Sequence, residues 1–541
     1  MPTCAHVLAK TLKAGGVTTL FGLPGGEILT FVEAAKRVGI DFLLTRHEAT
    51  ASLMADATGQ MLRRPGVCVS TLGPGAVNMT LGVANAYLDR SPLLAITAST
   101  ATSAAPYATH QNLDLSAVYR PFTKAVLTLD GQDTEAKVRR AFRTAMTPRM
   151  GPVHIALPSD VACAEDRQTV DPSGEVFEPP PIPPPSAEAI TKMRSRLRAS
   201  KRPILILGLD LGVADVAAVR RFVEALNVPV FVTPKAKGML AEDHPNFFGV
   251  CAGVSGDGAI VDFLASADLL VGVGFEPVES EKLWHQTMPI VSIGPLSIAS
   301  GSFRPEMELE GQVVTALTAL SQAELGPFAW NPTELVAFRQ RLASVVAPAK
   351  TTGRGLSPSA VVQRLREVLP RETIATTDVG SVKFVTSQGW TTYEPMTFFE
   401  SNGLSAMSYA FPAAMAASLI FRDRPVLCTI GDGGFGMTMA DVETCVRLRL
   451  PIVTVVFNDC SLSLIQMAQA RRGLADVGVR YGKINFGMAA QALGAWGRRV
   501  ASLDELGAAV AEGRSTGRPV VIDVPVDPAE YRMHSAPPTV T

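Results

Sequence analysis

The chain has 541 residues, 47% of them hydrophobic and 18% charged, which is a globular composition and excludes disorder as the main state. This length exceeds what one hydrophobic core usually supports, so it predicts two to four domains. The formal net charge of -1 gives no electrostatic basis for binding nucleic acid or an anionic membrane, which favours small molecules or further copies of the chain as partners.

The N-terminal stretch MPTCAHVLAKTLKAGG lacks the apolar core of a secretory leader, and no stretch approaches the ~20 apolar residues of a membrane span. The seven cysteines are scattered and form no CxxC pair, which argues against a zinc knuckle or a redox dithiol. Cys68 and Cys428 lie in apolar runs and are predicted to be buried thiols. We expect a reduced protein located in the cytoplasm.

In the first third of the chain, apolar runs alternate with helical patterns such as EATASLMADATGQMLRR. The predicted strands are residues 42–45, 67–71, 93–99 and 153–158. This alternation predicts a doubly wound parallel sheet, assigned here to a domain of residues 1–168.

A proline-rich segment follows. Residues 170–189 read VDPSGEVFEPPPIPPPSAEA, and the six prolines between 179 and 185 predict a stiff extended linker. The next domain, residues 187–345, repeats the alternating pattern, with strands predicted at 203–209, 229–234, 268–274 and 289–294.

A second boundary, rich in Gly, Pro, Ser and Thr, lies at residues 345–360. The last domain, residues 356–541, has predicted strands in ETIATTD, PVLCTIGD, PIVTVVFND and PVVIDVP. The sequence therefore predicts an α/β protein of three doubly wound parallel-sheet domains, the first and last alike in architecture.

Two features of the first domain are compatible with chemistry. Glu48 follows a predicted strand and opens a helix, and a Gly73-Pro74-Gly75 loop follows the next strand. Locally, the simpler interpretations are a carboxylate stabilised by the helix dipole and a glycine turn.

The last domain contains IGDGGFG followed by a second apolar strand that ends at Asn458. A β-α-β unit would place Asp432 and Asn458 at the carboxyl ends of two parallel strands, where their oxygens suit a cation such as Mg2+. Gly431, Gly433 and Gly434 would let the backbone approach a diphosphate closely. For an isolated GDG match, a simple turn with Asp432 as the N-cap is the commoner outcome.

Taken together and in this order, several segments resemble the thiamine diphosphate-dependent enzymes of the acetolactate synthase and pyruvate oxidase group. They are FGLPGGEI, RHEATAS, TLGPGAVN, HQNLD, PFTK, GPVHIALPSDV, NGLSAMSYAFPAAMAAS and GDGGF…FND, and they cover nearly the whole chain. Gly431-Asp432-Gly433, 24 intervening residues (434–457) and Asn458 match the cofactor motif of that family. The resemblance implies a pyrimidine-binding, a central and a diphosphate-binding domain.

The resemblance also implies roles for individual residues. Asp432, the Asn458 side chain and the Cys460 carbonyl would bind Mg2+, and Glu48 would hydrogen-bond N1' of the aminopyrimidine. Met407, otherwise interpreted as a core residue, would support the bent cofactor, and the Ser405 carbonyl, where the family usually has Gly, would accept from N4'. The implied catalytic residues are Glu48, Gln111 and His110, and the implied cofactor-binding residues are Gly25, Glu48, Gly73, Asn78, Ser405, Met407, Gly431, Asp432, Gly433, Gly434, Phe435 and Asn458.

In this family Glu48 and the GDG segment of one active centre belong to different subunits. The resemblance therefore implies a homodimer or homotetramer with active sites between subunits.

Departures from the family bear on the reaction. Gln111 supports a carboligase pocket, whereas His110 is equally compatible with a proton relay or a loop histidine, and HQ replaces the HH pair of pyruvate decarboxylases. GFEPVES at 274–280 replaces a stretch that helps bind FAD and carries a substrate-binding arginine, which argues against FAD. Ala468, in LSLIQMAQA, stands where the family has a specificity-setting Trp, so a larger or differently shaped acceptor could fit.

We therefore expect a lyase or acyltransferase that uses thiamine diphosphate and Mg2+ to decarboxylate a 2-oxo acid and to transfer the acyl-anion equivalent to a second carbonyl compound. The alternative is a 2-oxo acid decarboxylase that does not ligate. A catalytically silent cofactor-binding regulatory subunit is a third hypothesis, and the retention of Glu48, Asp432 and Asn458 speaks against it. The sequence identifies neither donor nor acceptor.

Overall fold

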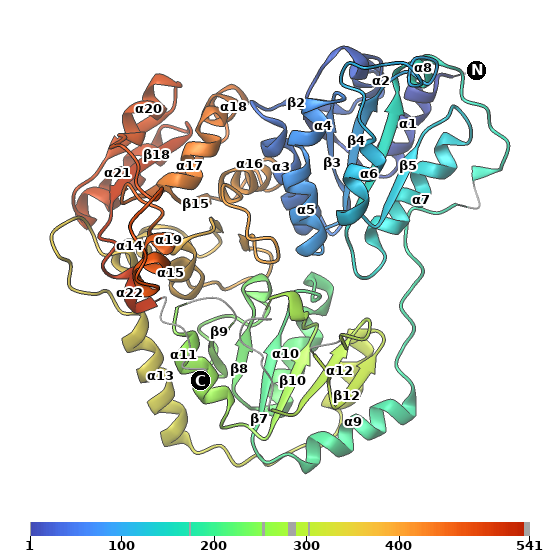
Figure 1. The fold of residues 1–541 in the computed structure, drawn as a ribbon. Coiled ribbons are helices and arrows are strands. Elements are labelled where there is room, and N and C mark those ends of the chain that lie inside the picture. Colours follow the sequence, from blue (N-terminus) through green and yellow to red (C-terminus); the bar gives the residue numbers. More distant parts are fainter. Residues whose placement is uncertain (1, 173–174, 252–254, 280–287, 301–302, 535–541) are drawn as a thin grey trace. The chain divides into compact units, whose positions relative to one another are not determined.

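The computed structural model describes residues 2–172, 175–251, 255–279, 288–300 and 303–534. It contains three six-stranded sheets, and every strand pairing within them is parallel (Figure 1). The predicted fold class of three doubly wound parallel sheets is therefore confirmed. Within the described residues, no helix is both long enough and apolar enough to cross a membrane.

The first sheet has the order β2-β1-β3-β4-β6-β5. Its strands are β1 (Thr19–Leu23), β2 (Asp41–Leu44), β3 (Gly66–Ser70), β4 (Leu93–Ser99), β5 (Ala125–Thr128) and β6 (Pro152–Pro158). The helices of this part are α1 (Cys4–Ala14), α2 (Leu29–Arg37), α3 (Glu48–Leu62), α4 (Pro74–Asn78), α5 (Thr80–Leu88), α6 (Leu115–Tyr119), α7 (Thr134–Met146) and α8 (Ser159–Cys163).

The central sheet has the order β12-β11-β10-β7-β8-β9. Strands are added outward from β7 on one side and then from β10 on the other, so the strand order reverses between these two neighbouring parallel strands. Its strands are β7 (Pro203–Leu207), β8 (Val230–Val232), β9 (Phe247–Val250), β10 (Leu269–Val273), β11 (Ile290–Gly294) and β12 (Met307–Glu310). Its helices are α9 (Ala187–Ala199), α10 (Val216–Leu226), α11 (Asp257–Leu264), α12 (Val313–Ser321) and α13 (Pro332–Val346).

The third sheet, β14-β13-β15-β16-β18-β17, repeats the order of the first, which confirms that the two outer domains share one architecture. Its strands are β13 (Ile374–Thr377), β14 (Phe398–Glu400), β15 (Val426–Gly431), β16 (Ile452–Asn458), β17 (Trp496–Arg499) and β18 (Val520–Pro525). The helices of this part of the chain are α14 (Pro358–Val368), α15 (Ser381–Gly389), α16 (Ala410–Ile420), α17 (Asp432–Thr438), α18 (Val442–Leu448), α19 (Ser463–Arg471), α20 (Phe486–Ala492), α21 (Leu503–Ser515) and α22 (Tyr531–His534).

The chain forms two compact units. One comprises residues 1–181, 401–422 and 438–448, and the other comprises residues 182–400, 423–437 and 449–541. The first unit thus contains the first sheet together with α16 and α18, and the second contains the central and third sheets. The proline segment 179–185 has neither helix nor strand, as predicted for a linker.

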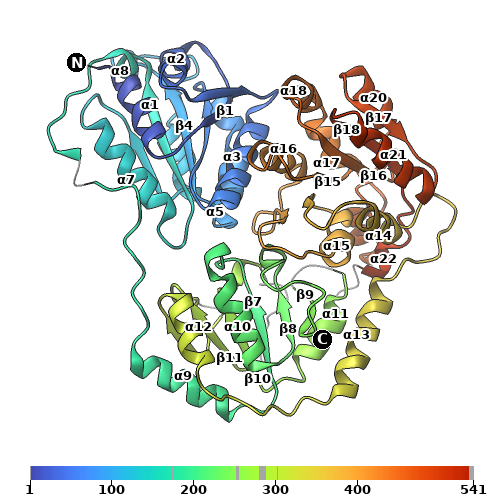
Figure 2. The same cartoon turned by 180° about the vertical axis from the view of Figure 1, so that it is seen from behind.

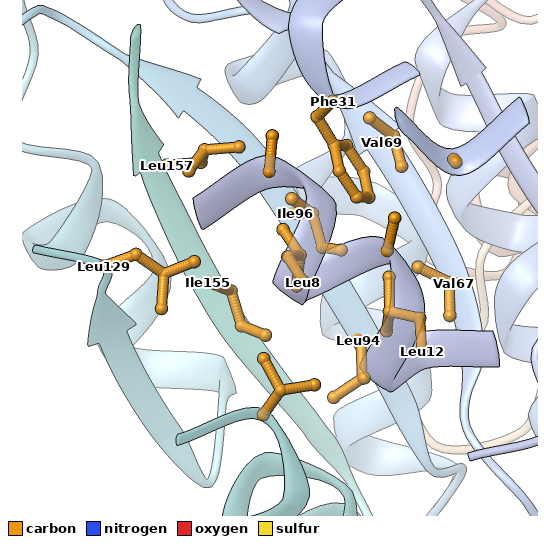
Figure 3. Packing of buried hydrophobic residues seen from close by; sticks show 14 of the residues in the cluster. Leu8, Leu12, Phe31, Val67, Val69, Leu94, Ile96, Leu129, Ile155 and Leu157 are labelled. Carbon is orange, nitrogen blue, oxygen red and sulfur yellow. The ribbon is translucent and has the colours of Figure 1, made fainter. Parts of the chain in front are cut away.

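Alternating apolar residues explain why helices cover both faces of each sheet. In the central sheet, Leu205 and Leu207 pack with α9, α10 and α12, whereas Ile204 and Ile206 pack with α11 and α13 on the other face. These helices are labelled in Figure 2. In the first sheet, Leu8 of α1 lies in the same cluster as Val67, Val69, Leu94 and Ile96 (Figure 3). Burying one such side chain contributes roughly 1.5–3 kcal/mol.

Candidate cofactor site

The two residues predicted to hold a metal ion follow neighbouring parallel strands. Gly431, the last residue of β15, pairs with Phe457 of β16, so Asp432 and Asn458 lie at the same carboxyl edge of the third sheet. Open α/β sheets bind ligands at this edge.

Asp432 is a buried carboxylate, with 7% of its surface exposed. Its Oδ2 accepts a hydrogen bond of 2.6 Å from the Cys460 N–H, and its Oδ1 accepts one of 2.7 Å from the Gly433 N–H. Burial, and then the negative charge of Asp459, raises the pKa of Asp432 to about 7. A cation bound here would offset both costs.

Asn458 is held so that its side-chain oxygen is the atom available to a ligand. Its Nδ2 donates to the Ile484 carbonyl at 3.0 Å and to Asp523 Oδ1 at 2.9 Å, and these bonds assign the orientation of the amide. Cys460 Sγ lies 3.4 Å from the Asn458 oxygen. The amide oxygen therefore faces the same loop as the Asp432 carboxylate.

The Cys460 carbonyl, the third predicted ligand, accepts a hydrogen bond of 2.9 Å from the Tyr481 N–H. A carbonyl oxygen has a second lone pair, so this bond leaves a position for a cation. Cys460 adopts a φ of 59°, a left-handed conformation that turns the chain sharply after β16.

The donor set of this edge fits a hard divalent cation. The described residues contain no cluster of three or more His, Cys, Asp or Glu side chains that could hold a metal. One carboxylate, one amide oxygen and one carbonyl oxygen suit Mg2+, which usually completes its shell with water and phosphate oxygens.

The glycine loop leaves room beside these ligands. A Cβ atom built on Gly431 would meet no other atom within 4 Å, so the packing of the chain does not itself require glycine there. Phe435, by contrast, is fully buried and contacts Phe486 edge-on, with ring centroids 5.5 Å apart. The buried Phe435 side chain therefore holds the glycine loop against the interior of the domain, while the backbone at Gly431 remains partly exposed.

Glu48 lies in the other unit and is the first residue of α3, as predicted. The preceding His47 caps the helix by accepting from the Ala49 N–H at 3.1 Å. The Glu48 side chain is 5% exposed, and its Oε2 accepts from Asn78 Nδ2 at 3.0 Å. A Cβ at Gly75 would come within 3.0 Å of Glu48 Oε1, so the glycine permits the close approach of the loop.

Gln111 and Gly73 also come together in this unit. A Cβ at Gly73 would lie 2.9 Å from Gln111 Cβ, and both residues have positive φ, 61° and 54° respectively. Gln111 and the neighbouring His110 are exposed. Gly25 follows β1 by two residues, and a Cβ atom at this position would lie 2.6 Å from the Thr71 side chain.

The loop that carries Ser405 and Met407 is fixed by Asp89. The Asp89 Oδ1 accepts from the Gly403 N–H at 2.7 Å and from the Asn402 N–H at 3.2 Å. Ser405 has a φ of 57°, which explains in physical terms why glycine is the usual residue at such a position. Met407 is half-buried, unlike the fully enclosed side chain expected of a core methionine.

Sequence reasoning did not single out three acidic residues that support these positions. Asp441 accepts from the Arg46 N–H at 2.8 Å and from Thr50 Oγ1 at 2.7 Å, on either side of Glu48. Asp89 fixes the 401–406 loop. Asp459, whose pKa is raised to about 6 by burial, lies beside Asp432. Only Asp459, in the FND segment, had a local signal that could have identified it.

The crevice of the central sheet lies where the loops after β7 and β10 meet. There the Asp210 N–H donates to the Gly274 carbonyl at 2.9 Å, and the buried Glu279 carboxylate accepts from the Leu209 N–H at 3.1 Å. Burial raises the pKa of Glu279 to about 8. Ser280, the last residue of the GFEPVES segment, lies outside the described residues.

Three family models match the chain. They are "Thiamine pyrophosphate enzyme, N-terminal TPP binding domain" over residues 2–118, "Thiamine pyrophosphate enzyme, central domain" over 190–320 and "Thiamine pyrophosphate enzyme, C-terminal TPP binding domain" over 378–524.

Several named proteins are similar to the chain over nearly its whole length. An acetolactate synthase of Bacillus subtilis is 29% identical over 536 residues, covering 97% of this chain and 93% of that protein. The acetolactate synthase isozyme 2 large subunit of Escherichia coli is 28% identical, covering 99% and 97%. A probable 2-ketoarginine decarboxylase of Pseudomonas aeruginosa is 29% identical, covering 93% and 90%.

Proposed function

The chain belongs to the thiamine pyrophosphate (thiamine diphosphate) enzymes and is acetolactate synthase-like, and from this premise we propose its reaction. With thiamine diphosphate and Mg2+, it decarboxylates a 2-oxo acid and transfers the resulting acyl-anion equivalent to a second carbonyl compound. The oxygen donors at the carboxyl edge of β15 and β16 are the observation that carries this proposal.

The metal end of the proposed site rests on Asp432 and Asn458. Asp432 accepts a hydrogen bond from the Cys460 N–H, and Asn458 donates to the Ile484 carbonyl and to Asp523. These bonds orient both side chains, so both oxygens are positioned before any cation binds. Mg2+ held by them and by the Cys460 carbonyl would neutralise the diphosphate.

The proton-transfer end of the proposed site rests on Glu48. Bound thiamine diphosphate would supply a nucleophilic carbon that adds to the 2-oxo carbonyl, and its positively charged ring would take up the electron pair released when CO2 leaves. Glu48 is enclosed by Asn78 and Gly75, which limits the access of water and fixes one carboxylate oxygen. Its remaining oxygen would hold a proton against the ring nitrogen of the cofactor.

Active sites shared between two subunits form part of the same proposal. Glu48 and Asp432 belong to different compact units of the chain, and the family resemblance assigns them to different subunits of one active centre. We expect a homodimer or a homotetramer, which light scattering on the holoenzyme would measure.

We propose that no FAD binds to the central domain. The Glu279 carboxylate is buried where the loops after β7 and β10 meet, which is the crevice that receives the phosphates of a dinucleotide in doubly wound folds. The buried carboxyl, with its raised pKa, brings no positive charge to such phosphates, and GFEPVES at 274–280 replaces the stretch that, by the family resemblance, helps to bind FAD. Absorbance of the purified protein between about 350 and 500 nm would test this directly.

A decarboxylase that does not ligate is the second candidate. It is favoured by the similarity to a probable 2-ketoarginine decarboxylase and by the small side chain of Ala468 on α19. Release of CO2 from a panel of 2-oxo acids, measured with and without thiamine diphosphate and Mg2+, tests both candidates. CO2 release without the cofactor would contradict both.

A further inference from the structure

A cavity of about 560 Å³ lies behind α19, within the second compact unit. Its walls come from three separate stretches of chain besides the helix: residues 352–354, residues 474–480 and residues 528–532. This volume is typical of a site for a small metabolite.

Three arginines line this cavity and give it a positive charge. Among the described residues of its lining, Asp476 is the one acidic side chain, and it pairs with Arg480 at 2.5 Å. Arg354 and Arg532 are exposed, and neither guanidinium has a carboxylate partner within the part of the chain that the structure describes. Two uncompensated guanidinium groups suit the bidentate binding of a carboxylate or a phosphate.

The cavity does not coincide with the expected substrate position. Five residues of α19 line it. At about 100° per residue, Ser463, Gln466, Met467 and Ala470 lie on one face of the helix, and Gln469 lies at the border of that face. Ala468, the position expected to set substrate specificity, lies on the opposite face. A ligand in the cavity would therefore contact the back of this helix.

Two residues in the cavity wall are hydrogen-bonded to the loop that contains the proposed metal ligands. Ser463 Oγ donates to Asp459 Oδ2 at 2.6 Å, and Ser461 Oγ donates to Gln466 Oε1 at 3.1 Å. Gln466 in turn donates from Nε2 to Asp476 Oδ2 at 2.8 Å. The Arg480–Asp476 pair thus connects through Gln466 to Ser461, the residue next to Cys460.

We propose that this cavity is a regulatory site for a small anionic molecule that carries a carboxylate or a phosphate group. The occupant draws Arg354, Arg480 and Arg532 together and changes the hydrogen bonds that reach Asp459 and Ser461. Binding of the anion is independent of the proposed reaction, whereas its effect on the metal end rests on the proposed function.

Calorimetric titration of the holoenzyme tests the site, with inorganic phosphate in one arm and succinate in the other. Saturable binding of either probe supports the site, and the arm in which it occurs identifies the preferred group. We expect the Arg354→Ala/Arg532→Ala double variant to bind at least about tenfold more weakly. The matched control is Arg514→Ala, an exposed arginine on α21 of the same unit, and it should bind like the parent protein. Binding of neither probe, or equal binding by the double variant, would overturn the proposal.

The coupling has its own measurement. We expect a saturating concentration of the bound probe to change the apparent Mg2+ affinity by roughly fivefold or more, because the linkage between two sites is reciprocal. The double variant in the same buffer corrects for chelation of Mg2+ by the probe. An unchanged Mg2+ affinity would remove the regulatory role. Anion binding without any 2-oxo acid turnover would leave the site intact and contradict the proposed function instead.

Discussion

The Asn78 side chain donates a hydrogen bond of 3.0 Å to the Glu48 carboxylate, and the two residues are 30 positions apart in the chain. Asn78 ends α4, and Glu48 begins α3. One oxygen of the buried carboxylate is therefore fixed by the protein, and the other is left for a ligand.

The first prediction concerns Glu48 itself. Glu48→Gln keeps the size of the side chain but removes the acid that would hold a proton at the cofactor ring. We expect kcat to fall by about 10²–10⁴-fold while thiamine diphosphate stays bound, because such a residue acts through proton transfer. Steady-state kinetics and a cofactor-binding titration measure the two quantities. Glu33→Gln, at an exposed position on α2, is the control, and an unaltered rate in Glu48→Gln would defeat this role.

The second prediction concerns the metal end. Asp432→Asn removes the charge of the only carboxylate among the three proposed ligands, and we expect the apparent Mg2+ affinity to fall at least about a hundredfold. The same variant should bind thiamine diphosphate weakly at limiting Mg2+ and partly recover at high Mg2+. Asp504→Asn, exposed on α21, should behave like the parent protein. Equal Mg2+ dependence in Asp432→Asn and the control would show that the ion binds elsewhere.

The third prediction concerns substrate size. Ala468 lies on α19, on the face away from the arginine-lined cavity. Ala468→Trp should reduce kcat/KM for branched or long 2-oxo acids by about 10- to 200-fold and affect pyruvate much less, because in the proposed site the added ring would fill space near the reacting groups. Ala470→Trp, on the cavity side of the same helix, separates this effect from a general disturbance of α19. A uniform loss for all substrates would contradict a specificity role for position 468.

The fourth prediction concerns pH and stability. His154 in β6 is fully buried, stacks on Tyr119 at 4.0 Å and bonds Thr97 through Nε2 at 2.9 Å. Burial lowers its pKa to about 3 from the ordinary 6.5. Below pH 6.5, His154 therefore becomes protonated in the unfolded chain but stays neutral in the folded protein. The free energy of unfolding consequently falls as the pH drops toward 3.

The size of this effect follows from the same linkage. Between pH 6.5 and pH 5, His154 should cost roughly 1.6 kcal/mol of folding free energy, and His154→Gln should remove that dependence. Unfolding by denaturant at both pH values measures it, with His6→Gln on α1 as the control. An identical pH dependence in the parent protein and His154→Gln would show that folding does not lower the pKa of this imidazole.

Much of the fold could be predicted from apolar runs because interior strands of parallel sheets are buried on both faces. Residues 203–209 and 451–459, for example, contain β7 and β16. The strands that the sequence did not predict are β1 and five edge strands, β5, β9, β12, β14 and β17. An edge strand such as Met307–Glu310 alternates polar and apolar residues, and so it lacks the continuous apolar signal.

The residues of the candidate site fall into two groups: some have a local sequence signal, and others depend on contacts between distant parts of the chain. Asp432 and Asn458 could be located because each directly follows a strongly apolar strand. The roles of Asp441 and Asp89 could not be predicted in this way. Asp441 binds Arg46, which is 395 residues away in the chain, and Asp89 binds Gly403, which is 314 residues away. No local pattern encodes such contacts, and only the packing of α3, α16 and α18 within one unit brings them together.

The balance of products tests the proposed reaction most directly. The holoenzyme is given pyruvate, and then longer 2-oxo acids, with and without a second carbonyl compound, and CO2, free aldehyde and hydroxyketone or acetohydroxy acid are measured together. We predict that CO2 exceeds free aldehyde and that the ligated product accounts for the difference. Aldehyde equal to CO2, one for one, with every donor and acceptor would contradict carboligation and leave a simple decarboxylase.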